Sequence, residues 1–140
     1  YRPVQPDVYV VMHAGSREVL TPERRAFFTV ILLPDRIAVV TDERHTDPAR
    51  AQLVLYNFAD QPAELRAVEP DVAILPVVGV GSSARRVVNA ITVELAVSLG
   101  SQVGFTTELA MERGESYTVV VSGAADDRFG FAVQATVRSE

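Results

Sequence analysis

The chain consists of short apolar runs, and several of these runs alternate apolar with polar or small side chains. The longest alternation covers residues 91 to 98, where every second residue is Ile, Val or Leu. A period of two residues is typical of a strand that buries one face. Ten runs predict strands: Val8 to His13, Ala26 to Leu33, Ile37 to Thr41, Gln52 to Phe58, Glu64 to Val68, Val72 to Val77, Asn89 to Leu99, Val103 to Met111, Tyr117 to Ser122 and Phe129 to Val137.

Turn-forming residues separate these runs and indicate the fold class. Gly, Pro and Asp lie at Pro34-Asp35, Asp60-Gln61-Pro62, Gly100-Ser101, Arg113-Gly114-Glu115 and residues 123 to 127. Short strands with turn signals every ~8 to 12 residues are typical of sandwiches and barrels. We therefore predict an all-β chain with little or no helix, folded as an antiparallel β-sandwich of immunoglobulin-like or jelly-roll-like type.

Two segments also allow a helical spacing of apolar residues, namely Arg17 to Phe28 and Ala84 to Leu99. In the first segment, Thr21 is a suitable N-cap and Pro22 suits the first helical position, so one short helical turn near Thr21 remains an option. In the second, the alternation over residues 91 to 98 favours a strand.

The run Leu53 to Phe58 is apolar on both of its alternating faces and carries Asn57 between two aromatic residues. One face would pack against an opposing sheet, and the other would be covered by a loop or by a partner protein. Asn57 would bond to nearby backbone groups in an Asx-type turn before residues 60 to 62. We expect this segment to be structural.

Length and composition predict one folded domain. The chain has 140 residues, is 48% hydrophobic and 22% charged, and has no apolar run near the ~18 to 20 residues that span a bilayer. We predict a single sandwich domain over 1–140, with 51–140 as its core and 1–41 as an N-terminal extension or a reduced first domain. The charged segment TDERHTDPAR, residues 41 to 50, marks the boundary.

The charge balance and the missing cysteines exclude several classes of function. Net charge is -5, from 18 acidic and 13 basic residues, which disfavours nucleic acid and anionic membranes as partners. Without cysteine there is no disulfide framework, thiolate metal site or cysteine nucleophile. The opening YRPVQP lacks the basic start and the apolar core of an export signal, so we expect that any such signal has been removed or was never there.

No catalytic or cofactor motif is complete. Ser82 and Ser83 follow a glycine-rich loop that lacks the last glycine of a nucleophile elbow, and the two histidines, His13 and His45, lie in a predicted strand and a charged loop. The same loop matches neither a P-loop nor a dinucleotide-binding turn. Four side chains that could bind a cation lie within six residues, namely Asp42, Glu43, His45 and Asp47. A solvated charged loop explains this cluster better than a metal site does. We predict no cofactor and no metal.

The pair Arg85-Arg86 precedes the predicted strand that begins at Asn89. Two guanidinium groups could bind a carboxylate or phosphate, or protect a sheet edge, and we favour a structural or partner-facing role. Asn89 lies where unpaired backbone groups would need a side-chain partner. We therefore predict that Arg86 and Asn89 form a structural joint at the start of this strand.

Four segments in a fixed order resemble the AlgF family, namely YRPVQP, PARAQLVLYNFADQPAELRAV, RRVVNAITVELAV and LAMERGESYTVVVSG. The matching positions are Tyr1, Pro3 and Pro6, then Ala51 to Asn57 with its Tyr56-Asn57 exit, then Arg86 and Asn89, then Leu109, Glu112, Arg113, Gly114, Ser122 and Gly123. One departure is that family members carry a full N-terminal β domain where this chain has a shorter segment.

The resemblance implies a function without catalysis. AlgF proteins are periplasmic accessory proteins of exopolysaccharide O-acetylation in alginate systems and, through relatives, in cellulose systems of biofilms. It implies a periplasmic adaptor whose partners are a membrane-bound O-acyltransferase and a periplasmic acetyltransferase or acetylesterase-like protein. Partner-facing or motif candidates are Tyr56, Asn57, Arg85, Arg86, Asn89, Glu112, Arg113 and Gly114.

Two other functions remain open from the sequence. A carbohydrate-binding sandwich would stack sugars on aromatic residues, and the candidates are Tyr1, Tyr9, Tyr56 and Tyr117. An acetylesterase would use Ser82 or Ser83 as its nucleophile. The choice of polysaccharide also stays open.

Overall fold

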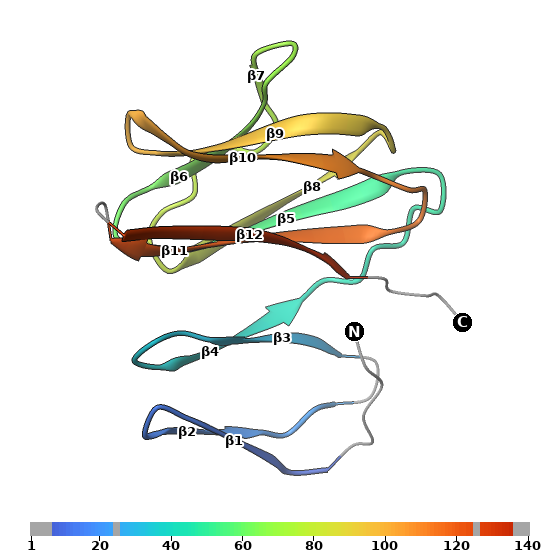
Figure 1. Ribbon diagram of the computed structural model, residues 1–140. Helices are drawn as coiled ribbons and strands as arrows, with labels where there is room; N and C mark the ends of the chain where they lie inside the picture. Colours follow the sequence, from blue (N-terminus) through green and yellow to red (C-terminus); the bar gives the residue numbers. More distant parts are fainter. Residues whose placement is uncertain (1–6, 24–25, 125–126, 136–140) are drawn as a thin grey trace. The chain divides into compact units, whose positions relative to one another are not determined.

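The computed structural model describes residues 7–23, 26–124 and 127–135, with side chains described as far as Gly123 (Figure 1). The chain divides into two compact units, Tyr1–Arg44 and His45–Glu140, and the division falls inside the charged segment 41–50. Strands and turns make up the regular structure of the described residues, which confirms the all-β prediction. No helix suited to crossing a bilayer is found in this described part of the chain.

The N-terminal unit is built from two β-hairpins. The first joins β1 (Tyr9–His13) to β2 (Ser16–Leu20), and the second joins β3 (Phe27–Leu32) to β4 (Ile37–Asp42). The turn of the first hairpin is Ala14-Gly15, with φ angles of 48° and 78°, and two positive φ angles suit the twist of a two-residue hairpin loop. The Nε2 atom of His13 lies 2.8 Å from the carbonyl oxygen of Leu33, which links the hairpins.

One alternative that the sequence left open for this unit does not appear in the described residues. Residues 21–23 form no helical turn, and residues 16–20, part of which was weighed as helix, form β2. The tight turn at Ala14-Gly15 returns the chain directly into a strand that pairs with β1, so hairpin pairing overrides the helical spacing of residues 17–20.

The C-terminal unit contains two four-stranded sheets that face each other (Figure 1). The first sheet has the order β10-β9-β6-β7 and the second the order β12-β11-β5-β8. The bounds are β5 (Ala51–Ala59), β6 (Ala63–Ala67), β7 (Val72–Ala73), β8 (Ser82–Val88), β9 (Thr92–Leu99), β10 (Gln102–Ala110), β11 (Ser116–Ala124) and β12 (Asp127–Ala135).

The core of this unit comes from alternate residues of both sheets, as a sandwich requires. Leu53 and Leu55 of β5 in the second sheet are fully buried together with Leu65 of β6 and Val97 of β9 in the first. Each such side chain contributes about 1.5–3 kcal/mol by leaving water, so this interior holds the two sheets together.

One strand pair departs from the antiparallel prediction. β5 and β11 pair in parallel, from Ser116 opposite Gln52 to Gly123 opposite Ala59, whereas every other described pair is antiparallel. Parallel neighbours need a crossover connection. Here the connection runs through β6, β7, β9 and β10 of the first sheet and through β8 of the second before the chain returns as β11.

The strand boundaries differ from the predictions mainly around β8. Residues 82–88 form a full strand where the sequence predicted a loop and an arginine pair, and the next strand begins at Thr92 instead of Asn89. The strand predicted over Val72 to Val77 is reduced to two residues. β8 was missed because it lies at a sheet edge and exposes most of its side chains, so its sequence carries no apolar alternation.

Candidate partner-binding site

Asn57 is the polar anchor of the C-terminal unit at the point where the chain leaves the second sheet. Its side chain is 0% exposed, and its Nδ2 donates to the carbonyl oxygens of Gln61 at 2.8 Å and Val78 at 2.9 Å. Its Oδ1 accepts from the backbone N–H of Ala59 at 3.0 Å. The predicted Asx-type turn is therefore confirmed, and the contact with Val78 adds a link across 21 residues of sequence.

Both faces of β5 are buried, which confirms that neither face of this strand is solvated. Tyr56 is 1% exposed and Val54 8%, although both point away from the face that carries Leu53 and Leu55. Polar positions on the same face as Tyr56 are paired, since Gln52 donates to the hydroxyl of Ser116 at 3.3 Å. Tyr56 and Asn57 thus belong to the interior and not to an exposed contact surface.

Arg85 and Arg86 both lie on the exposed strand β8 and, being consecutive, project to opposite faces of the sheet. The Nη1 of Arg86 donates to the carbonyl oxygen of Ile74 at 3.0 Å. Ile74 follows β7 of the first sheet, so Arg86 links the two sheets at one side of the sandwich.

Arg86 and Asn89 do not form the structural joint that we predicted at the start of the next strand. Asn89 is exposed, lies in the connection between β8 and β9, and makes no hydrogen bond with the described residues. The argument from a buried polar group therefore does not apply to Asn89. The link is made by Arg86, and it reaches the end of β7 instead of the start of β9.

The segment Glu112 to Gly114 forms a tight turn before β11. Gly114 has a φ of 79°, which favours glycine, and its N–H donates to the carbonyl oxygen of Arg50 at 2.8 Å. The N–H of Glu112 donates to the hydroxyl of the buried Tyr117 at 2.8 Å. The backbone of the turn is thus fixed from two sides, while the side chains of Glu112 and Arg113 are exposed.

The residues considered for catalysis and metal binding are not brought together. The Nε2 of the buried His45 lies 2.8 Å from the carbonyl oxygen of Arg50, and His13 contacts a backbone carbonyl as well. Ser82 and Ser83 lie on β8, and among the described residues no hydrogen bond joins a serine side chain to a histidine side chain. The described residues contain no group of three His, Asp or Glu side chains that could hold a metal ion.

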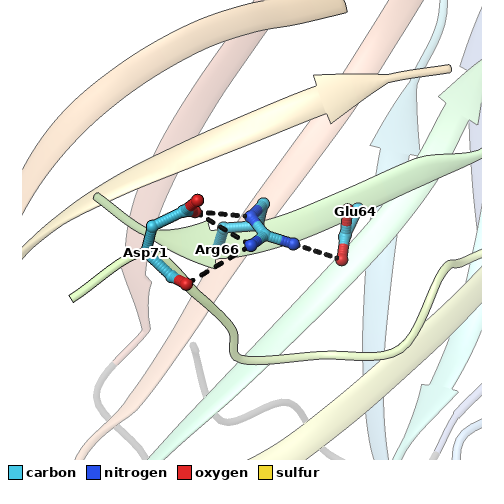
Figure 2. A network of polar contacts seen from close by, with 3 residues as sticks. All are labelled: Glu64, Arg66 and Asp71. Atoms are coloured by element: carbon cyan, nitrogen blue, oxygen red, sulfur yellow. Dashed lines mark hydrogen bonds and ion pairs between the residues drawn. The ribbon is translucent and has the colours of Figure 1, made fainter. Parts of the chain in front are cut away.

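An ion-pair network that the sequence analysis missed lies on the outer face of the first sheet. Figure 2 shows Arg66 of β6 between Glu64 and Asp71, at N–O distances of 3.0 Å and 2.9 Å. Hydrogen bonding to Asp71 above all raises the pKa of Arg66. The side chain of Asp71 is 79% exposed, so solvent screens the network. The network ties β6 to the turn before β7, and the alternation of Glu64 with Arg66 was its only sequence signal.

A group of exposed apolar side chains lies on one face of the first hairpin in the N-terminal unit. Val10 is 48% exposed and lies opposite Val19 on β2, which is also 48% exposed, and Met12 on the same face is 76% exposed. Val8, before β1, is 60% exposed. We call Val8, Val10, Met12 and Val19 the hairpin patch. Contiguous exposed apolar groups of this kind mark interaction surfaces.

The tyrosines proposed for sugar stacking are mostly unavailable. Tyr56 and Tyr117 are each 1% exposed, and Tyr9 is half-buried. Tyr1 lies outside the described residues. Sugar stacking needs an exposed ring face, so this arrangement offers little support for a carbohydrate-binding surface.

The fold is similar to a known one. The C-terminal domain of AlgF from P. aeruginosa matches the chain with a TM-score of 0.57 and 22% identity, over 62% of this chain and 99% of that domain. No protein-family model and no curated protein sequence matches the chain. This likeness shows that the chain contains the fold of that domain.

Proposed function

We propose that the chain is a non-catalytic periplasmic adaptor in the O-acetylation of a secreted exopolysaccharide, of the alginate or cellulose type. The observation that carries the proposal is the shared fold with the AlgF C-terminal domain over 99% of that domain. The sequence segments that resemble the AlgF family also support the proposal. They include the Tyr56-Asn57 exit and the Glu112-Arg113-Gly114 turn, and they occur in the order found in that family.

The structure supports a role in binding partner proteins. The C-terminal unit has an interior fixed by Asn57 and by leucine and valine side chains from both sheets. In contrast, Glu112 and Arg113 project from a turn whose backbone is held by Tyr117 and Arg50. A rigid frame with exposed charged and apolar side chains suits an adaptor, because little ordering entropy is lost when a partner binds.

The partners under this proposal are the periplasmic acetyltransferase or acetylesterase-like protein and the membrane-bound O-acyltransferase of the same system. The chain would hold these proteins together and would transfer no acetyl group itself. Deleting its gene should lower the acetyl content of the secreted polymer, measured by NMR of the purified polysaccharide. Unchanged acetylation in a clean, complementable deletion would refute the proposal.

The hairpin patch allows a sharper test of partner binding. Val10→Glu places a charge in the middle of the patch, and we expect it to reduce co-purification of the acetyltransferase components. Val103→Glu is the matched control, because Val103 is an exposed valine, 62% accessible, on β10 of the other unit. Equal retention of partners by both variants would exclude the hairpin patch as a contact surface.

A further inference from the structure

The outer edge of β8 is an unpaired strand edge of the second sheet. β8 pairs with β5 along seven residues, from Val88 opposite Ala51 to Ser82 opposite Asn57. Its other side has no neighbour in the strand order, and no backbone hydrogen bond joins residues 83–88 to a described strand other than β5. The peptide groups on that side are therefore a template for another strand.

Both edges of the first sheet carry features that resist pairing, and β8 does not. β7 is two residues long, and β10 contains a register shift between Val103 and Phe105. Short strands and bulges are common ways of protecting an edge. The register of β8 against β5 is continuous, and the strand contains no proline and no glycine.

The charge of β8 indicates what kind of strand would pair there. Arg85 projects on one face of the sheet and Arg86 on the other, and both are exposed. They stand out in a chain whose net charge is -5. Arg86 uses one guanidinium nitrogen for Ile74, and a guanidinium has five N–H donors. A partner strand with adjacent carboxylates would place one beside each arginine, because successive side chains alternate between the faces.

We propose that β8 is a docking edge that accepts an extended acidic segment of a partner protein as a fifth strand of the second sheet. Backbone hydrogen bonds give the affinity, and Arg85 and Arg86 select for carboxylates. Val87, 38% exposed on the same face as Arg85, adds an apolar contact. This inference rests on one part of the adaptor function proposed above, namely that the chain binds a partner protein.

The test uses the full chain and a synthetic probe. The probe is a blocked ten-residue peptide, Thr-Val-Thr-Val-Glu-Glu-Val-Thr-Val-Thr, titrated at low salt and followed by 15N NMR. We expect saturable shifts and slower amide exchange at residues 82–88, and affinity about 10-fold weaker for the same peptide with Gln-Gln in place of Glu-Glu. Shifts confined to other strands, or equal affinity for both peptides, would overturn the proposal.

Charge reversal supplies the matched variants. Compared with the wild type, Arg85→Glu should bind the acidic peptide more weakly and should bind the peptide with Lys-Lys in place of Glu-Glu more tightly. Arg36→Glu, at an exposed site in the turn between β3 and β4, should leave both affinities unchanged. Loss of binding in Arg36→Glu to the same extent would show a general charge effect and contradict the docking edge.

A cellular readout separates this inference from the proposed function. If Arg85→Glu keeps normal partner co-purification and polymer acetylation, the docking edge is refuted while the adaptor function stands. If gene deletion leaves acetylation unchanged but the peptide still binds at β8, the proposed role in acetylation is refuted and the docking edge is still supported.

Discussion

Replacing Asn57 with alanine should destabilise the C-terminal unit more than any substitution of an exposed polar residue. The change removes two donations, to Gln61 and Val78, and the acceptor for the N–H of Ala59. The carbonyl of Val78 keeps a partner, because it also accepts from the N–H of Ala63 at 2.9 Å. The N–H of Ala59 and the carbonyl of Gln61 lose the hydrogen bonds described for them.

The expected loss in the free energy of unfolding follows from the N–H of Ala59 and the carbonyl of Gln61, which both lose a hydrogen-bond partner. A buried polar group left without a partner costs about 1–3 kcal/mol. Ala59 is 2% exposed, so its N–H should cost close to 2 kcal/mol, and Gln61, in a partly exposed turn, about 1 kcal/mol. The sum of about 3 kcal/mol is a large part of the roughly 5–15 kcal/mol that stabilises a domain.

Urea unfolding measures this loss directly. The buried Tyr56 and Tyr117 provide a fluorescence signal for the C-terminal unit in a chain without tryptophan. With a slope of about 2 kcal/mol per molar urea, 3 kcal/mol lowers the midpoint by about 1.5 M. A midpoint for Asn57→Ala within roughly 0.3 M of the wild type would refute the reasoning.

Two further variants control for this prediction. Asn89→Ala removes an exposed asparagine without a described hydrogen bond, and it should leave the midpoint unchanged. Asn57→Asp keeps the acceptor for Ala59 but turns a carboxylate toward two carbonyl oxygens, so it should be at least as destabilising at neutral pH. A stable Asn57→Asp protein would show that the two donated bonds contribute little.

Three other predictions test neighbouring features. Tyr117→Phe removes the hydroxyl that accepts from Glu112 and should lower the urea midpoint by about 0.5 M, from a loss of about 1 kcal/mol; an unchanged midpoint would mean that water replaces the bond. Arg86→Ala removes the link to Ile74 and should cost about 0.5–1.5 kcal/mol by the same measurement, whereas a neutral result would assign Arg86 to partner contacts alone. Calorimetry with acetylated and unacetylated alginate or cellulose oligomers should give no saturable heat, because Tyr56 and Tyr117 are buried; clear saturation would favour a carbohydrate-binding module.

Local sequence patterns correctly predicted much of the strand content. The alternation of apolar and polar residues over 91 to 98 corresponds to the two faces of β9. Leu95 and Val97 lie in the core, and Glu94 is exposed. Asn57 and its turn were predictable because an Asx-type hydrogen bond needs only residues close in sequence. The strand β8 was not predictable in this way, since an exposed edge strand has no buried face to leave an alternating pattern.

Sequence alone therefore determined the all-β class, most strands and the turn at Asn57, because these depend on side-chain period and on short-range backbone bonding. Only the tertiary structure decided that β5 pairs in parallel with β11, that Asn57 reaches Val78, and that Arg86 joins the two sheets at Ile74. These contacts join residues 12 to 64 positions apart. Their partners are chosen by how the strands cross between the two sheets, and no local pattern of residues records that choice.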